Sequence, residues 1–255
     1  MIIWLNGALV PVEKARIDPG DRGFLLGDGL FETMRALNGE VQELARHYAR
    51  LQAGAELLRL SGTISEASLK SAIHDVLAAN WLTDAVLRLT VTRGSSPRGL
   101  LPSTISTPTM LLTAVSLLQQ NEPIRLIIST IRRDETSPLS KVKTLNYLPG
   151  VLARLEAMER GADDAVLLNH AGRVAEASAA TLFVLLRGVW VTPPVCEGAL
   201  GGVQRAVLVE SGHVQEAVVT CNDLKNAEAV SIGNALSLRP VSILDGRTLP
   251  SLLTP

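Results

Sequence analysis

The chain has 255 residues, 47% of them hydrophobic, and its 24 basic and 25 acidic residues leave a formal net charge of −1. This apolar content is enough for one large domain or two modest ones, and the balanced charge excludes the basic surface of a nucleic-acid-binding protein. The two cysteines lack zinc-site spacing and are too few for a disulfide framework. We recognise neither a secretory leader nor a stretch of about 20 apolar residues, so we expect a soluble cytoplasmic protein without membrane contact.

The first part of the chain is predicted to contain hairpins, helices and strands in turn. Asn6-Gly7 and Asn38-Gly39 each separate two apolar segments, and Asn-Gly best tolerates the positive φ angles of a tight hairpin turn. Helical spacing and alternation of apolar residues define the elements between and after these turns. The expected helices span 47–60 and 65–80, and the expected strands span 85–91 and 107–118.

The polar segment 119–123 is the best candidate for a linker, so we predict an N-terminal α/β domain over 1–118 and a C-terminal β-barrel-like domain with helices over 124–255. Because the elements do not repeat as βαβ units, we expect a mixed α+β protein rather than a doubly wound parallel sheet. The C-terminal elements are strands at 124–131, 164–169 and 181–186 and helices at 149–160 and from Gly202 onward.

Lys141 and Lys143 stand in apolar company within the segment 137–150. A lysine held in an apolar pocket has a lowered amine pKa, which a Schiff-base lysine requires. Spacing alone does not choose between the two. On that basis, two solvated lysines at a strand edge remain the simpler interpretation.

Two segments rich in small residues follow. Glu176 is the one carboxylate in 172–183, where it fits pairing with a cationic ring nitrogen in a buried site, with a solvated loop carboxylate as the alternative. The glycines of 197–205 precede a predicted helix, whose first N–H groups suit a phosphate. Helix starts also use glycine without any ligand.

Arg50, near a helix start, and Arg98, in a turn, each suit an anion or plain solvation. The histidines lack metal-ligand spacing, and the sequence has no GxSxG elbow. We therefore expect neither a metal site nor a serine nucleophile.

In this order, the segments resemble the fold-type IV pyridoxal 5′-phosphate (PLP) enzymes, which include branched-chain aminotransferases, D-amino acid transaminases and aminodeoxychorismate lyases. The resemblance runs nearly end to end and implies a two-domain, D-amino acid aminotransferase-like fold, a homodimer and a small-molecule substrate. The matching segments are Trp4–Gly7, Asp21–Phe24, Gly27–Thr33, His47–Leu51, Val91–Gly94, Lys143–Asn146, Gly161–Ala165, Val174–Glu176 and Gly202–Arg205.

The resemblance also implies residue roles. The family's lysine stands three residues before an asparagine, which selects Lys143 as the Schiff-base residue and not Lys141. Glu176 would hold the ring nitrogen protonated, and Arg50 would bind the phosphate. The remaining cofactor contacts fall to the backbone amides of Val203 and Gln204, to Tyr147, which is one residue out of register with the family's tyrosine, and to Asn234.

Within the family, D-amino acid transaminases have a tyrosine where Phe31 stands and an Arg-x-His triplet where this chain has Arg98-Gly99-Leu100. Losing donors around a buried substrate carboxylate costs a few kcal/mol, which disfavours that activity. The aminodeoxychorismate lyases instead resemble this chain at Thr33, Arg98–Leu100, Ala179-Ala180 and Asn234–Leu236, whereas Ala177 and Thr181 depart from the family pattern.

We therefore predict a PLP-dependent lyase of folate biosynthesis that converts 4-amino-4-deoxychorismate to p-aminobenzoate and pyruvate. In the reaction that the resemblance implies, Lys143, displaced by the substrate amine, removes a proton as the general base. Thr33 is a further catalytic candidate, and Phe31, Thr33, Arg98 and Asn234 are the expected substrate-binding residues. The alternative is a class IV aminotransferase acting on D-amino or branched-chain amino acids.

Overall fold

The computed structural model describes residues 1–103, 107–118, 122–250 and 255. The chain forms two compact units: unit 1 contains Met1–Leu118 together with Val142–Asn146, and unit 2 contains Gln119–Lys141 and Tyr147–Pro255. The assignment of all of 124–255 to one domain is therefore wrong for Val142–Asn146, which hydrogen-bonds to a strand of unit 1. Residues 119–121 of the predicted linker lie outside the described residues.

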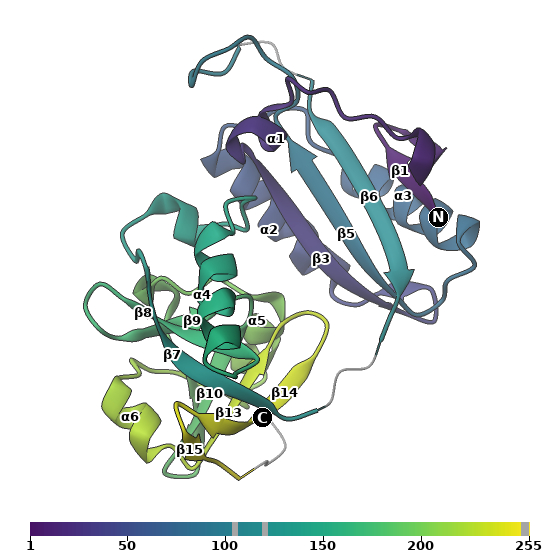
Figure 1. The fold of residues 1–255 in the computed structure, drawn as a ribbon. Helices are drawn as coiled ribbons and strands as arrows, with labels where there is room; N and C mark the ends of the chain where they lie inside the picture. The colour runs from purple at the N-terminus through teal and green to yellow at the C-terminus, as the bar shows by residue number, and fades with distance from the viewer. Residues whose placement is uncertain (104–106, 119–121, 251–254) are drawn as a thin grey trace. The chain divides into compact units, whose positions relative to one another are not determined.

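Unit 1 is built on a six-stranded antiparallel sheet with the strand order β2-β1-β6-β5-β3-β4 (Figure 1). Both Asn-Gly hairpins are present, with positive φ at Asn6, Gly7, Asn38 and Gly39. The elements are β1 Ile2–Leu5, β2 Ala8–Pro11, α1 Arg22–Leu26, β3 Gly29–Leu37, β4 Glu40–Val41, α2 Leu44–Leu57, α3 Glu66–Ala79, β5 Ala85–Thr92 and β6 Thr109–Ser116, with a short 3-10 turn at Val12–Lys14.

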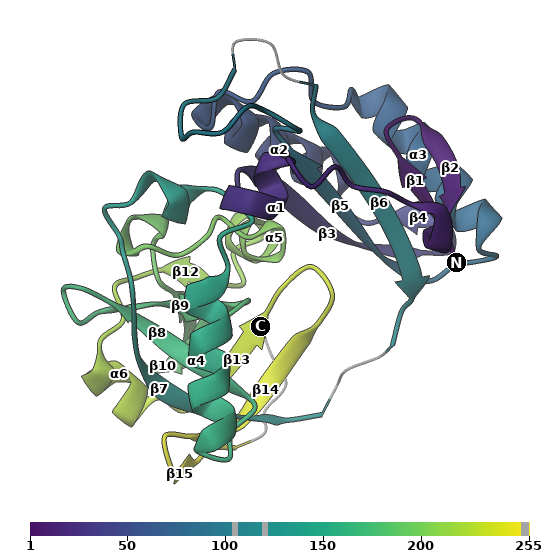
Figure 2. The same cartoon turned by 45° about the horizontal axis from the view of Figure 1, so that its top comes forward.

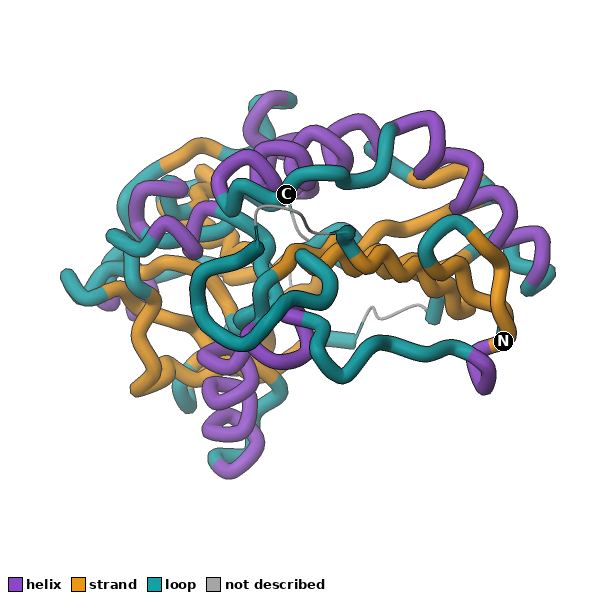
Figure 3. The backbone as a smooth tube through the Cα atoms, turned by 90° about the horizontal axis from the view of Figure 1, so that it is seen from above, coloured by secondary structure: helices purple, strands orange, loops and turns teal. Residues whose placement is uncertain are grey.

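The two faces of this sheet differ because successive strand residues point to opposite sides. Helices α2 and α3 cover one face, where Leu30 and Met34 of β3 pack in the main core of unit 1 (Figure 3). The second face carries Phe31 and Thr33 of β3, with Arg88 of β5 directly opposite Thr33 in the antiparallel register. Its side chains are therefore available for chemistry rather than for the helix-packed core.

Unit 2 contains a mixed nine-stranded sheet with the order β12-β11-β10-β13-β14-β7-β8-β9, and β15 pairs with β14. The β9 edge returns toward the segment after β12, because the Val174 N–H donates to the Val219 carbonyl at 2.9 Å and Arg173 bridges to Thr220. The strands are β7 Ile124–Arg133, β8 Asp164–Asn169, β9 Val174–Ala177, β10 Thr181–Leu186, β11 Val189–Thr192, β12 Gln215–Glu216, β13 Ala229–Gly233, β14 Leu238–Leu244 and β15 Arg247–Thr248.

Helix α4, Leu148–Glu159, packs on β7 and β8 through the small residues Ala153 and Ala157 (Figure 2). Helix α5, Val203–Glu210, packs against Phe183 of β10. The remaining helical segments of unit 2 are α6 Cys221–Asn226 and the 3-10 turns Pro138–Lys141 and Val195–Glu197.

The expected mixed α+β class is confirmed, and the predicted strands and helices lie within a few residues of the observed ones. The largest shift is at α2, which begins at Leu44 rather than His47, because Glu43 adopts a left-handed conformation at the helix start. None of the described helices is long and apolar enough to cross a membrane.

Candidate functional site

Lys143 lies on a short extended segment that pairs with the edge of β3. The Lys143 carbonyl accepts the Phe31 N–H at 3.0 Å, and the Leu145 N–H donates to the Gly29 carbonyl at 3.0 Å. The Lys143 side chain is half-buried, whereas Lys141 is exposed at the end of a 3-10 turn in unit 2. Two backbone hydrogen bonds therefore fix the position of Lys143, which distinguishes it from Lys141.

Lys143 and Arg88 both contact the ring of Phe31. The Lys143 Nζ is 4.3 Å from the ring centroid, and the Arg88 Cζ is 3.8 Å from it. Such cation–π contacts orient the cations and favour a ring without a hydroxyl group no less than tyrosine. The second face of the unit 1 sheet thus presents a lysine, an arginine and the half-buried Thr33 close to one aromatic ring.

Arg50 belongs to a buried polar cluster under β3. Its Nε donates to Glu32 Oε1 at 2.8 Å and its Nη2 donates to Glu32 Oε2 at 2.6 Å, while His47 Nδ1 lies 2.7 Å from Oε2. Burial alone would raise the pKa of Glu32, but the hydrogen bonds from Arg50 and His47 outweigh it and lower the pKa below the usual value of 4.5. Arg50 is therefore a guanidinium with a fixed plane.

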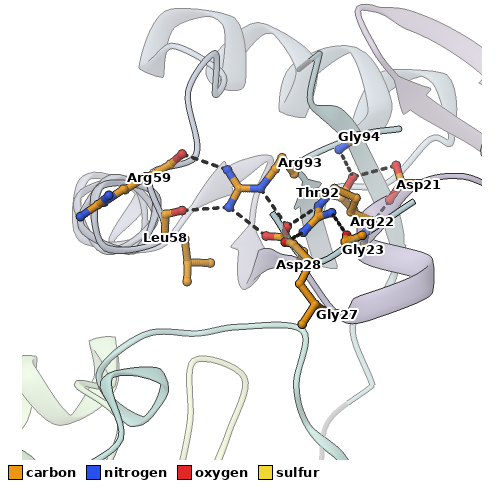
Figure 4. A network of polar contacts seen from close by, with 12 residues as sticks. Asp21, Arg22, Gly23, Gly27, Asp28, Leu58, Arg59, Thr92, Arg93 and Gly94 are labelled. Carbon is orange, nitrogen blue, oxygen red and sulfur yellow. Dashed lines mark hydrogen bonds and ion pairs between the residues drawn. The ribbon is translucent and has the colours of Figure 1, made fainter. Parts of the chain in front are cut away.

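A second network fixes the start of the loop that carries Arg98. Asp28 accepts hydrogen bonds from Arg22 and Arg93, and Arg93 also donates to the carbonyls of Leu58 and Arg59 (Figure 4). Burial tends to raise the pKa of Asp28, but hydrogen bonds from Arg93 and then Arg22 lower it overall.

Arg22 reaches into that loop, where it donates to the carbonyls of Gly99 and Leu100 at 2.9 and 2.7 Å. Arg98 itself is exposed. The structure thus anchors the loop but does not place Arg98 beside Lys143, which we expected to share a substrate with it.

In unit 2, Glu176 lies on β9 next to an irregularity in its pairing with β8. Such a bulge redirects side chains, and it turns the Glu176 carboxylate away from the strand's buried neighbours. Glu176 Oε2 accepts the Leu200 N–H at 2.9 Å, and Oε1 lies 3.0 Å from Arg133 Nε. The carboxylate is therefore held between a backbone amide and a guanidinium rather than solvated in a loop.

The start of α5 suits an anion. Gly202 is the N-cap, no side chain caps the first turn, and the Ala206 N–H is bonded to the Gly202 carbonyl at 2.9 Å. A Cβ at Gly202 would lie 3.0 Å from Thr181 Oγ1, so the glycine permits a close approach. An uncapped helix start of this kind, which includes Val203 and Gln204, matches the phosphate of PLP in charge and donor type.

Three further residues lie in unit 2 near these segments. Tyr147 is half-buried at the N-cap of α4, and its role stays a prediction. Asn234 is exposed, and its Nδ2 donates to the Ala179 carbonyl at 3.4 Å. Ser178, two residues after Glu176, has a buried hydroxyl with no hydrogen-bond partner among the described residues, so this region retains an unused donor.

Sequence reasoning missed Glu32, Arg88 and Arg133. Glu32 was detectable as an acid on the core face of a strand that otherwise carries Leu30 and Met34. Arg88 was seen on the polar side of an alternating strand, but its contact with Phe31 depends on strand register. For Arg133, the sequence contains no signal of its contact with Glu176, which is remote along the chain.

A model of the amino-transferase class IV family matches residues 29–244, and the chain belongs to this family. A Methanocaldococcus jannaschii protein with the provisional name branched-chain-amino-acid aminotransferase is 36% identical over 98% of this chain and 90% of its own. The solved 4-amino-4-deoxychorismate lyase of Pseudomonas aeruginosa is 30% identical, with a TM-score of 0.86 over 98% of this chain and 94% of its own.

A third relative bears on the cofactor. The branched-chain amino acid aminotransferase of the organism abbreviated T.th., solved with N-(5′-phosphopyridoxyl)-L-glutamate, is 28% identical, with a TM-score of 0.89 over 97% of this chain and 86% of its own. The family and this complex identify pyridoxal 5′-phosphate as the cofactor of the chain, and the donors described in each unit fit its aldehyde, ring nitrogen and phosphate.

Proposed function

We propose that Lys143 binds the cofactor covalently, that Arg50 and the Val203 and Gln204 amides bind its phosphate, and that Glu176 pairs with its ring nitrogen. The fixed backbone of Lys143, the fixed plane of Arg50 and the uncapped start of α5 support these roles. When bound, PLP supplies an electron sink for a carbanion beside the substrate amine. Tyr147 and Asn234 complete the proposed cofactor contacts.

For the reaction, we propose that the chain is an aminodeoxychorismate lyase. The observation that carries the proposal is the group around Phe31, where Arg88, Thr33 and Lys143 gather on one face of the unit 1 sheet. The substrate is a dianion with two carboxylates, so Arg88 supplies a partner for one of them. Thr33 supplies a small hydroxyl donor in place of a bulky side chain.

In this proposal, each residue of the chain has a defined task. Arg88 binds a carboxylate and orients the ring, and the Lys143 Nζ removes the proton from the carbon that bears the amine. Loss of the enolpyruvyl side chain as pyruvate then leaves an aromatic product. Arg98 and Asn234 remain proposed substrate contacts, with Arg98 on the anchored loop.

A class IV aminotransferase acting on D-amino or branched-chain amino acids is the second candidate. The 36% identity to the M. jannaschii protein supports it, and Arg88 would serve equally for an amino-acid carboxylate. The two reactions differ in their need for an amino acceptor, because only transamination requires a keto acid.

The test is an incubation with 4-amino-4-deoxychorismate without any keto acid, followed by separate measurement of pyruvate and p-aminobenzoate. The lyase releases both in equal amounts, and Lys143→Ala abolishes the release. If turnover instead needs 2-oxoglutarate and consumes D-alanine, D-glutamate or leucine, the aminotransferase is the function and the lyase proposal fails.

We also propose that the chain acts as a homodimer. Helix α4 turns its small residues inward and its large apolar residues outward, which is the reverse of a helix that ends its packing within one chain. The exposed side chains at helical spacing are Leu148, Val151, Leu152, Leu155 and Met158.

A further inference from the structure

Arg133, at the end of β7, contacts three separate segments of unit 2. Its Nε donates to the Gly198 carbonyl at 2.9 Å and lies 3.0 Å from Glu176 Oε1, and its Nη2 donates to the Ser140 carbonyl at 3.4 Å. The side chains of Arg133 and Glu176 are 21% and 12% exposed. This pair is thus substantially removed from solvent, where an ion pair is more than a surface contact.

The local backbone is shaped around Arg133. Gly198 has φ +98, and a Cβ at that position would lie 3.0 Å from Arg133 Cγ. Only glycine combines this left-handed conformation with space for the arginine stem. The turn that leads from Val195–Glu197 toward α5 is therefore fitted to the side chain of Arg133.

The three contacted segments are those to which cofactor contacts are assigned. Ser140 lies three residues before Lys143 along the chain, Glu176 is the proposed partner of the ring nitrogen, and Gly198 precedes the α5 start by only a few residues. Glu176 Oε2 is itself bonded to the Leu200 N–H in the same turn. Arg133 and Leu200 thus hold the two carboxylate oxygens from different sides.

We infer that Arg133 is a positioning residue of the cofactor site, which keeps Glu176 anionic and oriented toward the ring nitrogen and couples it to the turn before α5. The inference rests on the proposed role of Glu176. A guanidinium at 3.0 Å favours the charged carboxylate, and an anionic carboxylate in turn favours a protonated pyridine. Arg133 touches neither cofactor nor substrate in this role, since it acts through Glu176.

The experiment compares Arg133→Gln, Arg133→Lys, Glu176→Gln and the Arg133→Gln/Glu176→Gln double variant. Each apoprotein is titrated with PLP, and the absorbance of the bound cofactor is then followed against pH. Arg132→Gln is the matched control, because Arg132 is the neighbouring residue on β7 and its Nη1 donates only to the nearby Ser129 carbonyl among the bonds described. Thermal midpoints of the apoproteins report structural damage separately.

Loss of a charge-assisted contact predicts PLP binding on the order of ten-fold weaker for Arg133→Gln, with a shifted pH midpoint of the absorbance. Glu176→Gln shows the same two changes, and the double variant is no weaker than the worse single variant, because both act through one contact. Arg133→Lys restores part of the affinity, since it keeps the charge but loses the fork geometry. Arg132→Gln binds PLP as the unaltered protein does.

The opposite results are equally clear. If Arg133→Gln lowers the thermal midpoint but leaves PLP affinity and the absorbance titration unchanged, Arg133 is only structural and the inference fails. Multiplying effects in the double variant would overturn the coupling to Glu176. If Glu176→Gln itself changes neither readout, the proposed role of Glu176 fails first, and this outcome differs from a failure confined to the Arg133 variants.

Discussion

Glu32 holds Arg50 through two hydrogen bonds, from Nε to Oε1 at 2.8 Å and from Nη2 to Oε2 at 2.6 Å. We expect Glu32→Gln to weaken PLP binding on the order of ten-fold, because a neutral amide cannot accept both bonds and leaves the guanidinium free to turn. Binding of pyridoxal, which lacks the phosphate, stays unchanged. Absorbance titration of the apoprotein with both compounds measures the ratio.

The control is Glu66→Gln, which removes an exposed carboxylate paired with Lys70 on α3. Tighter PLP binding by Glu32→Gln would contradict the prediction, because it would mean that Glu32 competes with the phosphate for Arg50 rather than orienting it.

Acid sensitivity follows from the same carboxylate. The pKa of Glu32 in the folded chain lies below its usual 4.5, so ionised Glu32 stabilises the fold above the unfolded pKa, and this stabilisation is lost as pH falls through the folded pKa. Asp28, with a pKa below its usual 3.8, acts in the same direction. We expect the urea midpoint to fall between about pH 5 and pH 3.

Glu32→Gln should lower the urea midpoint at neutral pH and flatten its dependence on pH in that acid range. An unchanged slope would show that Glu32 is not among the groups that link proton binding to folding.

Borohydride reduction of the PLP-bound protein should fix the pyridoxyl group to Lys143. The half-buried Lys143 is held on β3, whereas Lys141 is exposed at the end of a turn. Peptide mass spectrometry reads the modified residue directly. A label on Lys141, or none, would refute the assignment, and Lys141→Arg serves as the control that should label normally.

Substrate recognition should depend more on Arg88 than on Arg98. Arg88 lies over the Phe31 ring that also contacts Lys143, whereas Arg98 is exposed. We expect Arg88→Gln to raise KM for a carboxylate substrate about ten-fold with a smaller change in kcat, as for a lost charge-assisted contact. Steady-state kinetics of both variants decide the matter, and a larger effect from Arg98→Gln would reverse the ranking.

Charge on the exposed face of α4 should disrupt the dimer. Leu152 is 52% exposed in the middle of the apolar row, so Leu152→Glu places an unpaired carboxylate where a partner subunit would pack. Sedimentation should show a monomer, whereas Lys70→Glu on α3 leaves the dimer intact. A Leu152→Glu protein that sediments as a dimer would remove α4 from the interface.

Local patterns predict much of this fold because they act over few residues. Asn-Gly sets the two hairpins through its tolerance of positive φ, and alternation in 85–91 defines β5 with its polar side. Helix periodicity places α3 within one residue, since Ser65 is a true N-cap. The start of α2 was misplaced because its N-cap, Glu43, has no capping side chain to announce it.

The site is less accessible to such reasoning. Spacing could not separate Lys141 from Lys143, because the difference arises from hydrogen bonds to β3, more than a hundred residues earlier. The partners of Arg50 and Glu176 likewise come from other elements, and a buried carboxylate shows its partner only after the chain has folded. Resemblance to a family supplied those roles without their contacts.

The short segment Val142–Asn146 also constrains how the chain can be made and divided. The backbone passes from one unit to the other after residues 118, 141 and 146. A nascent chain that has emerged only as far as Leu118 lacks the neighbour that bonds to Gly29 and Phe31, so unit 1 is completed on the ribosome only when Asn146 is out. Expression of 1–118 and 119–255 as separate fragments would leave Arg50 and Lys143 on different polypeptides.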